Sequence, residues 1–267
     1  MKLVKLSWVP AVVLTAGMAV ALGSTFVGGA AATAQSAPCP SVQVFVDAGT
    51  YAFDAYRQQH PGAAIPPSFI PGGMAVPLQN LSADTSGRIS YYTVDYPAQP
   101  NTWFNWAGIF QSEQAGVVNT ENAVRSFVAS CPNSSIALYG YSQGAWVAGD
   151  VATDIANHAN PASPAKLKAT FLQADPVQTP GRGTFIGPRV SGTGVLPARY
   201  AGFGGNNATT FEFCATGDLW CNSSVGVPQI AAAAVNNPAH GTYDTYQVAP
   251  GVPTTQWIKN YLVQNVR

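Results

Sequence analysis

The segment around Ser142 constrains the fold of this chain more than any other. An apolar run over residues 135–139 leads directly into Gly140-Tyr141-Ser142-Gln143-Gly144, and apolar residues at helical spacing follow. Gly-x-Ser-x-Gly between a strand and a helix is typical of a nucleophile on a sharp turn, because glycines leave room for its neighbours. A serine that merely caps the helix is the alternative interpretation.

Strands and helices alternate along the rest of the chain. Apolar runs predict strands at 42–46, 89–94, 135–139, 168–172 and 209–213, and apolar stripes predict helices at about 112–129, from Ser142 onward and at about 254–266. This order predicts an α/β fold, a three-layer α/β/α sandwich around a mainly parallel sheet. Residues 60–88 are expected to form an irregular excursion and 176–208 a long surface loop.

A serine nucleophile needs a base, and the chain contains three histidines. His60 precedes the serine, and His158 lies near the far end of the helix that begins there. The α/β-hydrolase order is serine, then acid, then histidine. Of the three histidines, His240 alone satisfies this order, and it is the candidate base.

Two acids compete to orient that histidine. Asp175 follows the strand at 168–172 and precedes a proline, which is equally consistent with turn chemistry. Asp218 follows the next strand and lies between Cys214 and Cys221. We favour Asp218, because a bridge across its loop would hold the acid rigid. Glu212 is a poor candidate because it lies within a strand.

An oxyanion hole requires at least two donors directed at the carbonyl oxygen. The backbone N–H of Gln143 is one candidate by its position after the serine. Thr50, in the loop after the first strand, is the other, with a backbone N–H and a hydroxyl. A turn threonine without this role is the alternative.

The four cysteines are Cys39, Cys131, Cys214 and Cys221. An even number suits two disulfides in an oxidising compartment, and three pairings are possible. The short spacing of Cys214 and Cys221 favours a local bridge, which leaves Cys39 with Cys131. The spacing does not suit a metal site. No nucleotide or flavin motif is present in the sequence either, so no cofactor is expected.

The N-terminus resembles a targeting segment. Lys2 and Lys5 precede an apolar run, and small residues lead to a cleavage motif that ends at Ala34. We expect residues 1–34 to be a signal peptide and 35–267 a single secreted domain; an uncleaved membrane anchor is the alternative. The formal net charge is zero, with 9% charged residues, so no basic face for nucleic acid is expected.

Several of these motifs together resemble the cutinase family of secreted serine esterases. The resemblance rests on Gly-Tyr-Ser-Gln-Gly-Ala at 140–145, Cys-x-Thr-Gly-Asp-x-x-Cys at 214–221 and His-x-x-Tyr at 240–243. Cys-Pro at 39–40 and 131–132 and Tyr-Pro-Ala at 96–98 add to it. The sequence departs from the family pattern at 47–50, where Asp-Ala-Gly-Thr contains no arginine. Its long segments at 60–88 and 176–208 resemble those of bacterial cutinase-like enzymes acting on cell-envelope lipid esters.

The resemblance implies a secreted carboxylic ester hydrolase that forms an acyl-enzyme on lipid-like or polyester substrates. It assigns Ser142, Asp218 and His240 to a catalytic triad and Thr50 and Gln143 to the oxyanion hole. Acyl transfer to a hydroxyl and a catalytically silent binding protein are the rival functions. We expect a monomer without stable membrane insertion once the signal is removed. Aromatic and small residues are candidates to line an acyl groove, namely Trp103, Phe104, Trp106, Trp220 and the run 231–235. Core packing is the alternative for each, and Trp220 is the best candidate because it lies close to Asp218 in the sequence.

Overall fold

The computed structural model describes residues 38–99, 106–223 and 237–266. The chain from Pro38 onward forms one compact unit. The predicted signal peptide at 1–34 lies outside the described residues. So do Trp103, Phe104, the side chain of Trp106 and the run 231–235.

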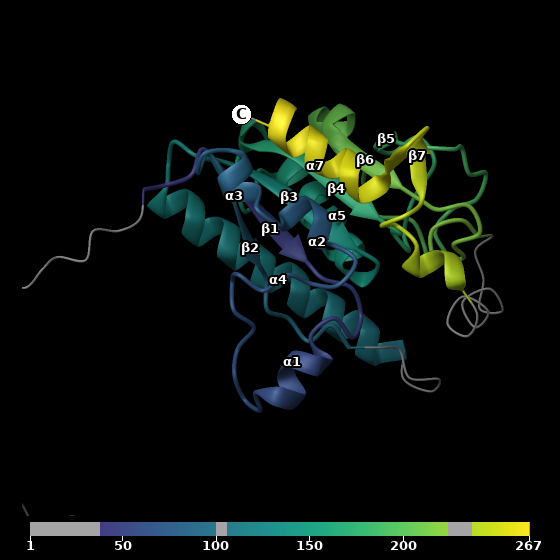
Figure 1. Cartoon of the computed structure of the whole chain (residues 1–267), viewed down its shortest axis with the longest axis horizontal. Helices are drawn as coiled ribbons and strands as arrows, with labels where there is room; N and C mark the ends of the chain where they lie inside the picture. Colours follow the sequence, from purple (N-terminus) through teal and green to yellow (C-terminus); the bar gives the residue numbers. More distant parts are fainter. Residues whose placement is uncertain (1–37, 100–105, 224–236, 267) are drawn as a thin grey trace, which may run out of the picture. The chain divides into compact units, whose positions relative to one another are not determined.

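A parallel sheet forms the centre of this unit (Figure 1). Its strands are β1 (Val42–Asp47), β2 (Ile89–Thr93), β3 (Ser135–Tyr141), β4 (Leu167–Gln173), β5 (Thr184–Phe185) and β6 (Thr210–Phe213). The order across the sheet is β2-β1-β3-β4-β6-β5, and every neighbouring pair is parallel. A short antiparallel pair, β7 (Gln247–Ala249) and β8 (Val252–Pro253), stands apart from it.

Helices cover both faces of the sheet. Within the described residues the α-helices are α1 (Asp54–Gln59), α2 (Ala75–Leu78), α3 (Leu81–Asp84), α4 (Trp106–Ser130), α5 (Gln143–His158) and α7 (Thr254–Asn265). The described residues also form short 3₁₀ helices, η1 (Pro164–Lys166), η2 (Gly204–Thr209) and η3 (Pro238–Gly241). The two-residue period of the strands explains the layers, because successive side chains point to opposite faces.

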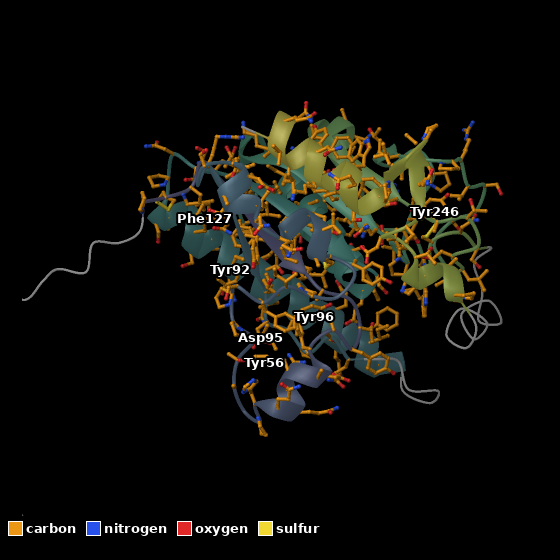
Figure 2. The ribbon with its side chains drawn as sticks, viewed as in Figure 1. Tyr56, Tyr92, Asp95, Tyr96, Phe127 and Tyr246 are labelled. Atoms are coloured by element: carbon orange, nitrogen blue, oxygen red, sulfur yellow. A yellow bond between two sulfur atoms is a disulfide. The ribbon has the colours of Figure 1, made fainter. Side chains whose placement is uncertain are left out.

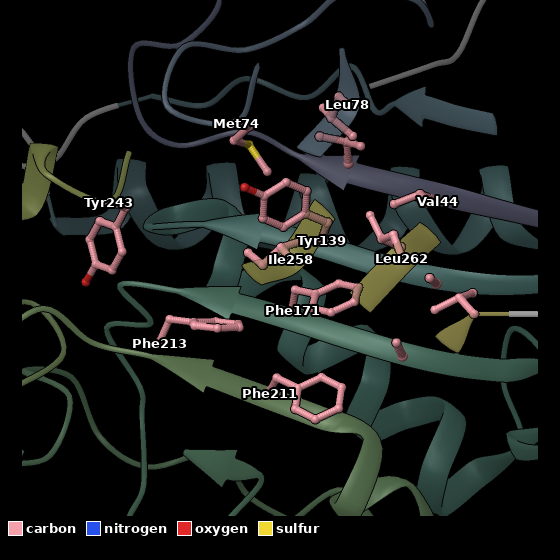
Figure 3. Packing of buried hydrophobic residues seen from close by; sticks show 14 of the residues in the cluster. Val44, Met74, Leu78, Tyr139, Phe171, Phe211, Phe213, Tyr243, Ile258 and Leu262 are labelled. Atoms are coloured by element: carbon pink, nitrogen blue, oxygen red, sulfur yellow. The ribbon is translucent and has the colours of Figure 1, made fainter. Parts of the chain in front are cut away.

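One face of the sheet packs against α7, α2 and α3. Tyr139 of β3, Phe171 of β4 and Phe213 of β6 extend from neighbouring strands toward Ile258 and Leu262 of α7 (Figure 3). The opposite face packs against α4 and α5 through a second cluster that includes Phe45, Leu138, Val124 and Val151. The predicted α/β/α sandwich with a mainly parallel sheet is therefore confirmed.

Two of the expected irregular segments differ from the prediction. The excursion at 60–88 contains α2 and α3, which place Leu78 and Leu81 in the core. The loop at 176–208 is not only a surface loop, since Val195, Leu196 and Arg199 within it are buried. Both segments are rich in glycine and proline. These residues interrupt the apolar periodicity, so the sequence pattern does not predict the short helices or the buried residues.

Helix α4 begins at Trp106, earlier than the predicted start near Ser112.

Both predicted disulfides are present, Cys39–Cys131 and Cys214–Cys221. Among the described residues, no helix combines the length and the apolar character needed to cross a bilayer.

Candidate active site

The turn between β3 and α5 holds Ser142 in a strained conformation. Its backbone has φ 57° and ψ −122°, which is rare for a residue with a side chain. A Cβ on Gly140 would overlap the backbone of Gly144, and one on Gly144 would overlap the carbonyl of Asp47. Gly140 is therefore required by the tightness of the turn itself, and Gly144 by the close approach of the turn to the end of β1.

The Ser142 hydroxyl does not cap α5, although Ser142 occupies the N-cap position. It lies instead 2.9 Å from Nε2 of His240, which belongs to η3 near the C-terminus. The other imidazole nitrogen, Nδ1, lies 3.0 Å and 3.1 Å from the two carboxylate oxygens of Asp218. Three side chains from distant parts of the chain thus form one continuous hydrogen-bonded series.

Asp218 is fully buried, yet it is well supplied with donors. Its Oδ1 accepts from the Trp220 backbone N–H at 3.0 Å and from Asn237 at 2.9 Å, and its Oδ2 accepts from the Tyr243 hydroxyl at 2.7 Å. Burial by itself raises the pKa of Asp218. The hydrogen bond and the charge of His240, followed by the hydrogen bonds from Tyr243 and Asn237, outweigh it and lower the pKa below its ordinary value.

The ionised Asp218 determines the direction of the other hydrogen bonds. A carboxylate only accepts, so Nδ1 of His240 donates to it. A neutral imidazole carries one N–H, which leaves Nε2 as an acceptor for the Ser142 hydroxyl. The arrangement is therefore able to take the serine proton onto His240 and to stabilise the resulting imidazolium.

Tyr141 also contacts His240, in two ways. Its hydroxyl donates to the His240 carbonyl, and its ring stacks on the imidazole with centroids 5.3 Å apart. Burial, followed by the charges of Asp218 and Asp244, raises the pKa of Tyr141, so the phenol remains a donor. The sequence pattern predicts no role for Tyr141 or Asn237. It includes Tyr243 only as the last residue of the His-x-x-Tyr motif.

The competing residues have other partners. Asp175 pairs with Arg199, whose Nη1 lies 2.5 Å from Oδ2. His158 lies at the end of α5 and contacts Asp154 at 3.3 Å. His60 follows α1 and its ring lies against Tyr56. Among the histidines, His240 alone has a described contact with Ser142 or Asp218.

The two candidate oxyanion donors belong to different elements. Gln143 is the first residue of α5, where a backbone N–H has no acceptor within the helix. Its buried side chain is held by Ser112 at 3.1 Å and by the Gln99 carbonyl at 3.0 Å. Thr50 belongs to the turn after β1, whose Gly49 packs closely against Tyr141.

Aromatic residues adjoin the hydrogen-bonded series. The rings of Trp220 and His240 lie 6.1 Å apart, and Trp220 packs against a cluster of Trp146, Val177, Val195 and Leu196. Phe110 of α4 lies edge-on to Trp146, with centroids 5.1 Å apart, and is 38% exposed. Within the described ranges, no group of His, Cys, Asp and Glu residues is arranged to hold a metal ion.

Comparison with known proteins matches residues 62–259 to the cutinase family. A relative named Carboxylesterase Culp6 homolog, from Corynebacterium glutamicum, is 29% identical over 251 residues, covering 84% of this chain and 80% of the relative.

Two solved structures share the fold. A cutinase-like protein from Cryptococcus sp. has a TM-score of 0.57 and 20% identity, covering 84% of this chain and 94% of its own. The catalytic core domain of acetyl xylan esterase from Trichoderma reesei has a TM-score of 0.52 and 19% identity, covering 84% and 100%. With its Gly-x-Ser-x-Gly turn and the family match over residues 62–259, the chain belongs to the cutinase family and is a serine ester hydrolase.

Proposed function

We propose that Ser142, His240 and Asp218 form the catalytic triad of a secreted carboxylic ester hydrolase. The observation that carries the proposal is the hydrogen-bonded series from the Ser142 hydroxyl through His240 to Asp218. Ser142 attacks the ester carbonyl while His240 accepts its proton. His240 then protonates the departing alcohol, which leaves an acyl-enzyme ester on Ser142.

Water completes the cycle by the reverse series of steps. His240 removes a proton from the water, which attacks the acyl carbonyl, and the proton returns to Ser142 as the acid departs. The negative charge that develops on the carbonyl oxygen is stabilised by the backbone N–H of Gln143 and by Thr50. Position at the start of α5 supports Gln143 in this role, because partial positive charge gathers at a helix N-terminus.

The proposed substrates are lipid-like or polyester esters with an apolar acyl part. The support is the aromatic group beside His240, in which Trp220 packs against the cluster that contains Trp146, and the partly exposed Phe110 contacts Trp146. Burial of an acyl chain against such surface contributes about 25 cal/mol for each Å² removed from water.

We also propose that the chain is exported as one domain spanning residues 35–267 after removal of residues 1–34. The two disulfides support export, because such bonds persist in oxidising compartments. Mass spectrometry of protein expressed with its native N-terminus and recovered from the culture medium tests this. A mature chain that still begins before Gln35 contradicts the cleavage site.

A covalent label tests the nucleophile directly. A fluorophosphonate probe should modify the parent at Ser142, and Ser142→Ala should lose both the label and p-nitrophenyl ester hydrolysis while keeping its circular dichroism spectrum. Ser82→Ala, at an exposed position on α3, is the matched control and should retain both. Parent-like hydrolysis by Ser142→Ala would refute the assignment, and an unlabelled parent would favour a silent binding protein.

The fate of the acyl group requires a separate measurement. Incubating the enzyme with an ester and an added sugar, and quantifying free acid against acylated sugar, separates hydrolysis from acyl transfer. We expect free acid as the main product. Acylated sugar in excess would instead support an acyltransferase that uses the same acyl-enzyme.

A further inference from the structure

Three residues spaced three apart surround the Asp218 carboxylate: Asn237, His240 and Tyr243. The turn η3 explains the spacing of Asn237, its N-cap, and His240, because side chains at i and i+3 of a 3₁₀ helix lie on one face. Tyr243 follows the C-cap residue of the same turn. The His240 backbone N–H donates to the Asn237 carbonyl at 3.0 Å, which is the three-residue hydrogen bond typical of a 3₁₀ helix. One short segment thus brings three polar side chains to one acid.

The amide of Asn237 is oriented by a second contact. Its Oδ1 accepts from the Leu219 backbone N–H at 3.3 Å, on the loop that carries Asp218. Because the amide oxygen faces that N–H, its nitrogen faces Oδ1 of Asp218, at 2.9 Å.

The hydroxyl of Tyr243 is oriented in the same way. Its oxygen accepts from the Ala215 backbone N–H at 3.1 Å, so its single proton is directed to Oδ2 of Asp218, at 2.7 Å. Tyr243 is buried, and its hydroxyl also lies 3.4 Å from Sγ of Cys221. Each oxygen of the carboxylate therefore has a side-chain donor besides the histidine.

We propose that Asn237 and Tyr243 are positioning residues that fix the rotation of the Asp218 carboxylate, so that it accepts the Nδ1 proton of His240. The terminal torsion of an aspartate is broad, so burial alone does not set the plane of the carboxylate. Donors on both oxygens do set it. The proposal rests on the proposed function, in which Asp218 orients the catalytic histidine.

Steady-state kinetics of Tyr243→Phe and Asn237→Ala test the proposal. Each variant removes one donor to a carboxylate, so we expect kcat to fall about tenfold with KM changed by less than about twofold. Tyr246→Phe is the matched control. Its hydroxyl bonds to Thr216 on the acid loop at 3.1 Å without a described contact to Asp218, and Figure 2 labels it. It should keep parent kinetics.

A proton NMR spectrum separates positioning from general support of the loop. The Nδ1 proton shared by His240 and Asp218 should resonate far downfield in the parent, move or broaden in Tyr243→Phe and Asn237→Ala, and stay unchanged in Tyr246→Phe. This signal does not depend on turnover. If the parent hydrolyses no ester, the proposed function fails while the spectrum still tests the geometry.

Several results would overturn the proposal. One is a kcat equal to that of the parent in both Tyr243→Phe and Asn237→Ala. Another is an Nδ1 proton signal that stays at its parent position in both variants. An equal loss of kcat in Tyr246→Phe would assign the effect to loop rigidity instead. Should Tyr243→Phe fail to fold, Asn237→Ala, at a partly exposed position, decides the question alone.

Discussion

The phenol of Tyr141 donates a hydrogen bond to the carbonyl of His240, and its ring stacks on the imidazole of the same residue. Tyr141 directly precedes Ser142, so one residue next to the proposed nucleophile touches the proposed base twice. The edge of the Tyr141 ring also meets Gly49, where an added Cβ would lie 2.9 Å from its Cδ1. The ring thus contacts both the histidine and the loop that carries Thr50.

This contact leads to a graded prediction. Tyr141→Phe loses a hydrogen bond worth about 1 kcal/mol and should lower kcat/KM by about fivefold. Tyr141→Leu also loses the stacked ring and should lower it by a further factor of about five. Tyr91→Phe, which removes a hydroxyl bonded to the Ser68 carbonyl, should not change kcat/KM. Equal rates for Tyr141→Leu and the parent would rule out this role.

Removal of one disulfide should mainly lower stability, and removal of the other should mainly lower activity. Cys39–Cys131 closes a span of 92 residues, and its removal by serine substitution should cost about 4–5 kcal/mol in the chain-entropy model. Cys214–Cys221 closes a span of 7 and should cost about 2–3 kcal/mol. Because the shorter bridge encloses Asp218, its loss should reduce kcat more. Urea unfolding and ester kinetics of the two double variants measure both effects, and the opposite ranking in kcat contradicts the prediction.

Asp47, at the end of β1, should make folding stability depend on pH. Burial raises the pKa of Asp47 to about 7, although a hydrogen bond from Thr120 opposes the shift. In the unfolded chain the same carboxyl has its ordinary pKa of 3.8, so it loses its proton at a lower pH than in the folded state. The contribution to stability is complete below about pH 4 and is lost as pH rises toward 7.

Asp47→Asn removes this titration. The difference in unfolding free energy between variant and parent should shift in favour of the variant from pH 4 to pH 8, by on the order of a few kcal/mol. Urea unfolding of both proteins across this range gives the difference and cancels the contributions of other groups. A difference that stays constant with pH would exclude a neutral buried Asp47.

Arg199 anchors the loop at 176–208 to the interior. Its guanidinium pairs with Asp175 and with Asp150, at 2.7 Å from Nε, and donates to the carbonyls of Ala145 and Trp146 in α5. Arg199→Met leaves two carboxylates without their partner and should cost about 3–5 kcal/mol of unfolding free energy.

The control for this prediction is Arg125→Met on the surface of α4. Arg125 is exposed and pairs with Glu121 at 3.0 Å at the surface, where such a pair contributes about 0–1 kcal/mol. Chemical denaturation of both variants gives the comparison. Similar losses in the two would mean that the buried network stabilises no more than a surface pair.

Local patterns in the sequence determined much of the fold. The strand, the Gly-x-Ser-x-Gly turn and the following helix were predictable because the period of apolar residues and the space needed at a tight turn are local properties. The disulfides were also predictable, because the short spacing of Cys214 and Cys221 favours a local bridge and leaves Cys39 to pair with Cys131. The helices in the 60–88 segment and the buried part of the 176–208 loop were not, because their few apolar residues gain stability only from long-range packing.

The tertiary structure decided which groups meet. Chain order directed attention to His240, but Asp175 and Asp218 both follow parallel strands of the sheet, and only the folded chain places one beside the imidazole and the other beside Arg199. The contacts of Tyr141, Asn237 and Tyr243 depend on distances between loops far apart in sequence. Local spacing does not encode such distances, because they arise from how the sheet and its helices pack together.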